Sequence, residues 1–444
     1  MRIVIVNALY APLILGGAER SVTLLAEELA RCGDQVSVIT LHPDPEETVE
    51  TLNGVRVYRL PLDNRYWHYG QGARPAPAAR LLWHIGDVWN RRAAERVGQI
   101  LDHERPDVVH SNIITGFSVS VWQEVKKRNI RLVHTLRDYY LLCSRSALFR
   151  SGSTCTRRCA GCTALTANRR QASQLVDAVV SISEYVLDCH TRRGYFSRSA
   201  SSVIYNIAGK LTSRTHSPGT DPDDPLCFGY IGRVEEEKGI GVLLEAIGKL
   251  SGSNWRLKIA GVGLDGYVKA LKAKFNDPRI EWLGFTNARE FYASTDVTII
   301  SSVWPEPLSR TVIETYAAGK SAICARSGGI PEVAKLGRVV ATYPAKDHRA
   351  LAAIMDSAMR DTELWRSGGF RDTAALNLFT DTSIAARYRA VYQAGGQGRR
   401  SLIASGREGP KAVAVPQENG VGKTQALLTL NSTAGETCGS NCDA

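Results

Sequence analysis

The sequence predicts an α/β protein made of two halves, each with a parallel sheet and crossover helices. Three observations predict it. The chain has 444 residues, which is too long for one ordinary domain. Short apolar runs typical of strands alternate with helix-like segments along most of the chain. Between two such series lies a stretch rich in proline and polar turn residues, residues 213–225, which we interpret as part of a linker over 208–225.

In the first half, apolar runs bounded by polar residues predict six strands. These are Arg2–Val6, Gln35–Thr40, Asp107–His110, Arg131–Leu136, Ala178–Ile182 and Val203–Tyr205. After the first strand, apolar side chains recur at helical spacing and predict a helix over Ala18–Cys32. Its apolar face consists of Val22, Leu25, Ala26 and Leu29.

The second half repeats the alternation of strands and helices. The predicted strands are Cys227–Ile231, Leu257–Ala260, Ile280–Leu283, Val297–Ile300 and Ser321–Ala325. We therefore expect one domain over 1–207 and another over 226–380. Beyond Gly395 the composition turns to Gly, Gln, Ser and charged residues with weak periodicity, so residues 396–444 are expected to be disordered.

Composition narrows the function classes. Hydrophobic residues make up 44%, as in globular proteins, and no apolar run approaches the roughly 20 residues that span a bilayer. We expect a cytoplasmic protein, at the inner face of the membrane if it is membrane-associated. The net charge is +11, and residues 51–205 hold 23 Lys/Arg against 11 Asp/Glu. No basic run carries the aromatic residues typical of nucleic-acid binding, so an anionic membrane or an acidic acceptor fits this excess better.

The segment 304–319 contains two carboxylates separated by seven residues. Glu306 lies between two prolines, which keep the backbone extended. Ser309 is expected to cap a helix that ends before Gly319, with Glu314 inside it. Two carboxylates so placed suit a ligand held at two points, and the exposed N–H groups at the helix start favour an anion such as a diphosphate.

Three further motifs accompany this one. They are Met1–Asn7 leading to Gly16-Gly-Ala-Glu-Arg20, Phe228-Gly-Tyr-Ile-Gly-Arg-Val-Glu-Glu-Glu-Lys-Gly239, and Ser327-Gly-Gly-Ile-Pro-Glu332. Together the four motifs resemble retaining glycosyltransferases of family 4, over roughly residues 1–395. The resemblance implies the GT-B fold, with two Rossmann-like domains facing each other across a cleft and a final helix, 381–395, that crosses back to the first domain.

The resemblance also implies a function: transfer of a sugar, with retention, from a nucleotide-diphosphate donor to a glycan or lipid-linked acceptor in surface polysaccharide synthesis. No cofactor is implied for catalysis. Glu306 would contact the donor sugar and Glu314 the ribose hydroxyls, because carboxylates accept strong hydrogen bonds from hydroxyls. Arg233 and Lys238 would stabilise the charge that develops on the leaving diphosphate. The implied donor site is Gly16, Gly17, Gly232, Arg233, Lys238, Glu306, Leu308, Ser309 and Glu314.

One motif departs from the family pattern. Where many relatives have His-Asp, this chain has Arg137-Asp138, and arginine cannot act as a base. We keep both residues as candidate catalytic residues, with Arg137 holding a phosphate or an acidic acceptor. His134, three residues earlier, is interpreted as structural, whereas His110 is ambiguous.

Two other features have two interpretations each. Cys143, Cys155, Cys159 and Cys162 have spacings close to those of zinc ligands, so they are either a structural zinc site or ordinary loop thiols. Residues 76–101 predict an amphipathic basic helix that either binds a membrane surface or, as is more common, packs on its own domain. We favour packing.

Several other functions remain as alternatives. A sugar-nucleotide epimerase of the same fold is disfavoured by the Glu-x7-Glu helix, and a catalytically inactive sugar-nucleotide-binding subunit is suggested by Arg137. A glycosidase also uses two carboxylates, but not at a phosphate-binding helix start. Residues 412–424 resemble a P-loop whose first glycine is replaced by Gln417, and too little chain follows to build a sheet around it.

Overall fold

A computed structural model describes residues 1–70, 75–208 and 224–394. The predictions for the tail 396–444, including its P-loop-like segment, lie outside the described residues. The same holds for most of the predicted linker over 208–225.

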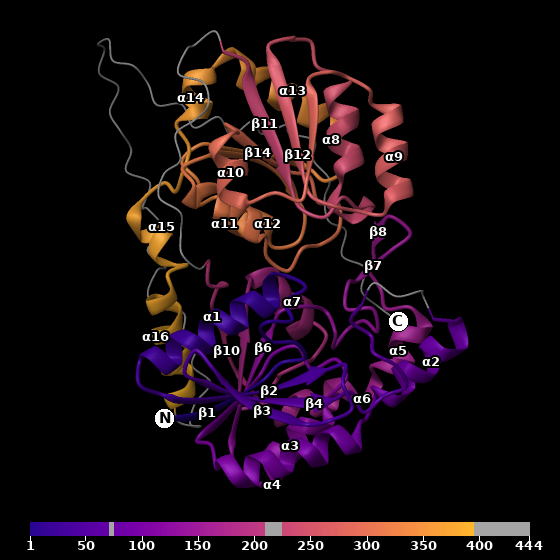
Figure 1. The fold of residues 1–444 in the computed structure, drawn as a ribbon, viewed down its shortest axis with the longest axis vertical. Helices are drawn as coiled ribbons and strands as arrows, with labels where there is room; N and C mark the ends of the chain where they lie inside the picture. The colour runs from indigo at the N-terminus through magenta and orange to yellow at the C-terminus, as the bar shows by residue number, and fades with distance from the viewer. Residues whose placement is uncertain (71–74, 209–223, 395–444) are drawn as a thin grey trace. The chain divides into compact units, whose positions relative to one another are not determined.

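The first half forms an eight-stranded sheet in the order β10-β9-β6-β5-β1-β2-β4-β3 (Figure 1). All neighbouring pairs are parallel except β3 with β4. Its strands are β1 (Arg2–Val6), β2 (Gln35–His42), β3 (Thr48–Leu52), β4 (Val55–Pro61), β5 (Val108–Ser111), β6 (Arg131–Leu136), β9 (Ala178–Ser181) and β10 (Ala200–Val203). The helices are α1 (Gly17–Arg31), α2 (Pro77–Gly86), α3 (Arg91–Glu104), α4 (Ser120–Lys127), α5 (Ala160–Leu165), α6 (Ala167–Ala172) and α7 (Glu184–Thr191).

The second half forms a six-stranded parallel sheet in the order β13-β12-β11-β14-β15-β16. Its strands are β11 (Leu226–Ile231), β12 (Trp255–Ala260), β13 (Ile280–Gly284), β14 (Val297–Ile300), β15 (Ser321–Arg326) and β16 (Val340–Pro344). The helices are α8 (Ile240–Ile247), α9 (Asp265–Lys274), α10 (Ala288–Ala293), α11 (Arg310–Ala317), α12 (Ile330–Ala334), α13 (His348–Arg360), α14 (Thr362–Arg366), α15 (Thr373–Asn377) and α16 (Asp381–Gln393). The predicted α/β class with two parallel sheets is confirmed.

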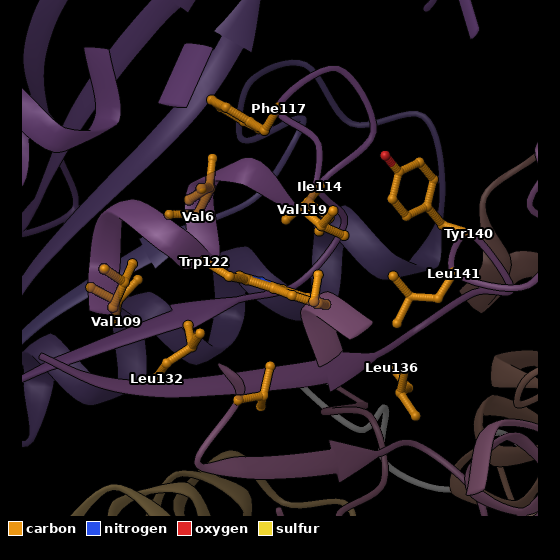
Figure 2. Packing of buried hydrophobic residues seen from close by; sticks show 14 of the residues in the cluster. Val6, Val109, Ile114, Phe117, Val119, Trp122, Leu132, Leu136, Tyr140 and Leu141 are labelled. Carbon is orange, nitrogen blue, oxygen red and sulfur yellow. The ribbon is translucent and has the colours of Figure 1, made fainter. Parts of the chain in front are cut away.

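The hydrophobic effect acts on both faces of each sheet, as expected for parallel strands covered by helices. On one face of the first sheet, Trp122 of α4 packs against Val109 and Leu132, which come from two neighbouring strands (Figure 2). The indole N–H of this fully buried tryptophan donates a hydrogen bond of 2.9 Å to Ser111. The predicted apolar face of α1 is buried on the opposite side of the sheet.

The last helix, α16, packs against α1 and β6 of the first half. Tyr392 forms a 2.7 Å hydrogen bond with His110, whose other ring nitrogen bonds Thr135 at the same distance. His110 is fully buried, and both of its nitrogens have partners. The ambiguity over His110 is thereby resolved in favour of a structural role in the α16 contact.

Most predicted strands match within two residues at each end, but two predicted elements differ more. The last strand of the first half covers Ala200–Val203 rather than Val203–Tyr205, because its pairing with β9 ends at Val203. The aromatic ring of Tyr205 instead stacks on Phe379, with ring centroids 5.3 Å apart. The apolar run therefore marks a buried segment, but its side chains pack beyond the end of the strand.

The predicted amphipathic helix over 76–101 is two helices, because Asn90 caps a new helix by accepting a hydrogen bond from the Ala93 N–H. The favoured interpretation, that its apolar side chains pack on the domain, is wrong for α2. Trp83 is the buried residue of this helix, whereas other large apolar side chains remain exposed. Exposed fractions are 53% for Leu81, 42% for Leu82 and 52% for Ile85, and Trp89, which follows the helix, is 39% exposed.

Candidate functional site

Glu306 and Lys238 form a close ion pair at the loop that enters α11. The Lys238 ammonium lies 2.6 Å from a Glu306 carboxylate oxygen, and the Ser302 hydroxyl donates to the same oxygen. Glu306 is 6% exposed. Burial alone would raise the pKa of Glu306, but the Lys238 charge and these hydrogen bonds outweigh burial and hold it below its usual value. Glu306 is therefore a fixed, ionised acceptor.

Glycines position this pair. Gly239 follows Lys238 with φ +69°, and a Cβ there would lie 1.9 Å from the Ser301 carbonyl oxygen. At Gly328, with φ +59°, a Cβ would lie 2.2 Å from the Glu306 carbonyl oxygen. Only glycine fits either place, since an L side chain is strained at positive φ and would clash with the backbone. The Phe228–Gly239 motif and the Ser327–Glu332 motif thus contact the Glu306 loop from two sides.

Arg233 lies apart from this pair. It follows β11, its side chain is 60% exposed, and its guanidinium is 2.8 Å from Glu235. An exposed ion pair of this kind adds little stability. The structure does not bring Arg233 into direct contact with Glu306 or Lys238.

The helix α11 has nearly the predicted bounds, but its cap differs. Ser309 occupies the N-cap position, yet its side chain accepts no capping hydrogen bond, so the predicted capping contact is wrong. Gly319 follows the helix with φ +78°. Leu308 and Ser309 are buried, and Glu314 is paired with Arg310 one turn earlier at 3.3 Å.

Arg310 was not identified as a site residue from the sequence. In the structure it connects distant parts of the site. Its guanidinium donates to the Ser21 hydroxyl at 3.0 Å and to the Ile207 carbonyl at 2.7 Å. Gly17 makes room for the Arg310 side chain, because a Cβ on Gly17 would lie 2.3 Å from that side chain. Gly16, the N-cap of α1, is exposed.

Arg310 is surrounded by like charges. Burial lowers its pKa, Arg20 and Arg137 lower it further, and Glu314 acts in the opposite direction. An arginine beside two other arginines favours an anionic ligand, which would relieve the repulsion.

Arg137 is buried and fixed by two amide side chains. Its guanidinium donates to Asn112 at 2.8 Å and to Asn206 at 2.6 Å.

Asp138, the neighbour of Arg137, accepts a hydrogen bond from the Tyr140 N–H at 2.9 Å. Burial raises the pKa of Asp138 to about 6, and nearby Glu19 adds to this rise.

His134 is buried and hydrogen-bonded to Ser111, and burial lowers its pKa to about 3, as expected for a structural histidine.

A buried ionic network lies next to this segment. Asp87 accepts hydrogen bonds from the Gly116 N–H at 2.7 Å and from the Tyr140 hydroxyl at 2.8 Å. Arg169 stacks over the Tyr140 ring at 3.7 Å and lies 3.4 Å from Asp87. Burial raises the pKa of Asp87 to about 6, although Arg169 opposes the rise. This network fixes the chain just after Asp138.

The four predicted cysteine ligands are only partly assembled. The sulfur atoms of Cys143 and Cys162 are 3.7 Å apart, whereas Cys155 is half-buried and Cys159 is exposed. Within residues 1–70, 75–208 and 224–394, no three His, Cys, Asp or Glu side chains form a group that could hold a metal ion as they stand.

A cavity of about 390 Å³ opens where β2 and β4 end. Carboxyl ends of parallel strands are the usual ligand-binding edge of such sheets. In the sheet, β2 is the neighbour of β1, the strand that leads to Gly16. Its lining combines aromatic and charged groups: Pro43, Asp44, Pro45, Pro61, Leu62, Asp63, Asn64, Tyr66, Trp67 and Arg96.

Two family models match the chain. A glycosyl transferase 4-like domain matches residues 16–206, and a model for glycosyl transferases group 1 matches residues 213–367. An uncharacterized 42.6 kDa protein in the cps region of Klebsiella pneumoniae is 34% identical over 337 residues, 76% of this chain and 88% of that protein. An uncharacterized glycosyltransferase of Methanocaldococcus jannaschii is 27% identical over 358 residues, 76% of this chain and 83% of that protein.

Solved structures agree on the fold. Sucrose-phosphate synthase from Thermosynechococcus elongatus has a TM-score of 0.67 at 19% identity, covering 88% of this chain and 98% of that one. Anabaena HepE in complex with UDP and glucose has a TM-score of 0.62 at 18% identity, covering 88% and 99%. At these identities the similarity shows the fold alone. Together with the family models and the Klebsiella relative, it establishes that this chain belongs to the GT-B glycosyltransferases of family 4.

Proposed function

We propose that this glycosyltransferase moves a sugar, with retention, from a nucleotide-diphosphate donor to a glycan or lipid-linked acceptor in surface polysaccharide synthesis. The Lys238–Glu306 pair, in which Glu306 is buried and Lys238 half-buried, is the observation that carries the proposal, because it places a cation and an ionised carboxylate side by side on the loop that enters α11. A screen of the purified protein against nucleotide sugars, followed by assay of transfer, tests it.

The two charges suit the two ends of the bond that breaks. As the donor reacts, the sugar becomes positive and the leaving phosphate becomes negative. An ammonium has three N–H donors, and Glu306 accepts one of them, which leaves two for phosphate oxygens. Glu306 would accept from a sugar hydroxyl or stabilise the positive sugar. Arg233 would reach the diphosphate from the exposed turn after β11.

Three observations support a nucleotide-sugar donor. Arg20 and Arg137 each repel Arg310, and an anionic ligand would relieve that repulsion. Glu314 is only 30% exposed but can exchange its contact with Arg310 for the ribose hydroxyls. HepE of Anabaena, which shares the fold, binds UDP-glucose. We place the donor at Gly16, Gly17, Gly232, Arg233, Lys238, Glu306, Leu308, Ser309 and Glu314.

The cavity beside β2 and β4 suits an acceptor sugar. Trp67 and Tyr66 offer aromatic faces for the apolar side of a sugar ring, and Asp44, Asn64 and Arg96 offer planar polar groups for its hydroxyls. The Klebsiella relative lies in a cps region, which supports an acceptor in surface polysaccharide synthesis. A protein of this function would act at the inner face of the membrane.

Asp138 should control the acid side of the pH profile. Because burial raises its pKa to about 6, the carboxyl is neutral below that pH and ionised above it. If the carboxylate takes part in transfer, kcat/KM falls as the pH drops through about 6, and Asp138→Asn lowers the rate and removes this limb. Asp87, whose pKa is also about 6, provides the control. We expect Asp87→Asn to lower stability and keep the limb, whereas an unchanged limb in Asp138→Asn would contradict the assignment.

We also propose that the four cysteines bind one structural zinc. A tetrahedral ion with Zn–S distances of about 2.3 Å separates its sulfur atoms by roughly 3.8 Å. The 3.7 Å between Cys143 and Cys162 matches this separation. The other two thiols are close by: hydrogen bonding to Cys162 lowers the pKa of Cys159, while burial and the neighbouring Cys143 and Cys159 raise the pKa of Cys155. Cys155 directly follows the short hairpin of β7 (Phe149–Arg150) and β8 (Ser153–Thr154). Cys159 is the N-cap of α5, a helix with no buried residue.

The zinc proposal predicts about one zinc per chain in protein purified without chelator. Cys159→Ser should release the metal and increase proteolysis within residues 142–166, while nucleotide affinity stays unchanged, because the donor site depends on other elements. Cys159 is exposed, so the substitution disturbs no core. Cys32→Ser, on a distant half-buried thiol, should keep the zinc. Elemental analysis that finds no metal in the wild type overturns the proposal.

A further inference from the structure

The apolar stripe of α2 has no partner in the described part of the chain. Leu81 and Ile85 are four residues apart and lie on one side of the helix, with Leu82 beside them, and Trp89 follows three residues after the helix ends at Gly86. All four are between 39% and 53% exposed. A helix at the margin of a domain normally turns such a stripe inward. Figure 1 shows α2 at the edge of the first half, with no strand of the sheet covering it.

The exposure does not come from a loosely attached helix. Trp83, on the opposite side of α2, is 1% exposed, and its indole N–H donates to the Tyr66 carbonyl at 3.1 Å. The Asn64 amide donates to the Trp83 carbonyl at 3.1 Å, and His68 stacks on the Trp83 ring at 4.6 Å. The helix is therefore fixed by its other face, and the stripe is presented to the outside.

The charges around the stripe are mostly positive. From residue 64 to residue 95 the sequence has five arginines and two acidic residues. Asp87 is 1% exposed and engaged with Arg169, whereas the side chain of Glu95 is 61% exposed and lies 4.0 Å from Arg91. Arg91 and Arg92, at the start of α3, are exposed. Apolar side chains with a tryptophan, flanked by more arginines than exposed acids, match the surface of an anionic bilayer, which offers acyl chains to the apolar groups and phosphate groups to the arginines.

We propose that α2 and the first turn of α3 dock on an anionic lipid bilayer, with Leu81, Leu82, Ile85 and Trp89 entering the interface. The inference rests on the proposed function, because a lipid-linked acceptor is held in that bilayer. Asn64 and Tyr66, which fix α2, also line the 390 Å³ cavity. Docking by α2 thus brings the proposed acceptor-sugar pocket to the membrane surface.

The proposed contact is peripheral, at the surface of the bilayer. Among the residues that the structure describes, no helix has both the length and the apolar character needed to cross a membrane. Contact through the exposed stripe requires no such helix.

Sedimentation of the full chain with vesicles tests the proposal. We expect the wild type to bind vesicles that contain phosphatidylglycerol, and to bind less well to phosphatidylcholine alone or at high salt. Leu81→Gln/Ile85→Gln should reduce binding at least about tenfold. Val49→Gln/Phe285→Gln, which removes apolar groups elsewhere that are more exposed than Leu81 and Ile85, should leave binding unchanged. Arg91→Glu/Arg92→Glu should weaken binding to the anionic vesicles only.

Vesicle binding needs no donor and no turnover, so it is measured independently of the proposed function. Transfer to a water-soluble acceptor by Leu81→Gln/Ile85→Gln reports on that function alone. A wild type that fails to bind anionic vesicles, or a variant that binds equally well, overturns the proposal. So does a shift from dimer to monomer in this variant without any vesicle binding, because the stripe is then an interface between two copies of the chain.

Discussion

Lys238→Ala is expected to lower turnover at least about tenfold, or about 1.4 kcal/mol, and to destabilise the protein by about 3 kcal/mol. The kinetic loss follows from the missing cation at the leaving phosphate. The loss of stability follows from leaving Glu306, 6% exposed, without the charge that lies 2.6 Å away. We place the value at the lower end for a broken buried pair because Lys238 keeps 23% exposure. Turnover at saturating donor and urea unfolding measure the two effects.

Two variants separate these effects. Lys238→Ala/Glu306→Gln removes the unpaired charge and should recover most of the lost stability without recovering activity. Arg233→Ala should also lower turnover at least about tenfold. Because the Arg233 side chain is 60% exposed and pairs only with Glu235, its removal should leave the free energy of unfolding almost unchanged. Unaltered turnover in Lys238→Ala or Arg233→Ala contradicts the role given to that residue.

Glu306→Ala and Glu314→Ala should act on different kinetic constants. Glu306 adjoins Lys238 and is assigned to the donor sugar, so its loss should mainly slow transfer. Glu314 lies one turn into α11 and is assigned to the ribose, so its loss should mainly weaken nucleotide-sugar affinity. Each lost charged hydrogen bond should cost about 1.5–3 kcal/mol. Binding titration and single-turnover rates distinguish the two.

The isosteric variants Glu306→Gln and Glu314→Gln serve as matched controls. Each keeps the shape of the side chain and one hydrogen-bond acceptor, and each should give a smaller effect of the same kind as its alanine variant. Equal losses of affinity in Glu306→Ala and Glu314→Ala, with turnover untouched in both, contradict the assignment.

Regular, buried elements could be predicted from the sequence because burial imposes a simple periodicity. Strands β1, β6 and β14 have the predicted bounds, and α1 differs by one residue at each end. The hairpin of β3 and β4 was missed because the residues of β3 are mostly exposed and show no apolar run. Its turn, Asn53-Gly54 with positive φ at both residues, is a strong hairpin signal that could have revealed it.

In the candidate site, the contacts between separate motifs could not be predicted from the sequence. Glu306 and Lys238 were named from separate motifs, but their contact spans 68 positions and no local pattern encodes it. Arg310 was missed because an arginine in the first turn of a helix is usually exposed, and only the tertiary structure places it against Gly17 and Ser21. The stripe of α2 was assigned to the core because amphipathic spacing is the same in a packed helix and in a surface-binding one.

The anomeric configuration of the product tests the central claim most directly. A nucleotide sugar that binds in the screen is incubated with the enzyme and an acceptor, and the new glycosidic linkage is examined by NMR. Our account predicts a new linkage whose anomeric configuration is that of the donor. An inverted linkage contradicts retention, and binding without transfer to any acceptor favours an inactive binding subunit over the glycosyltransferase proposed above.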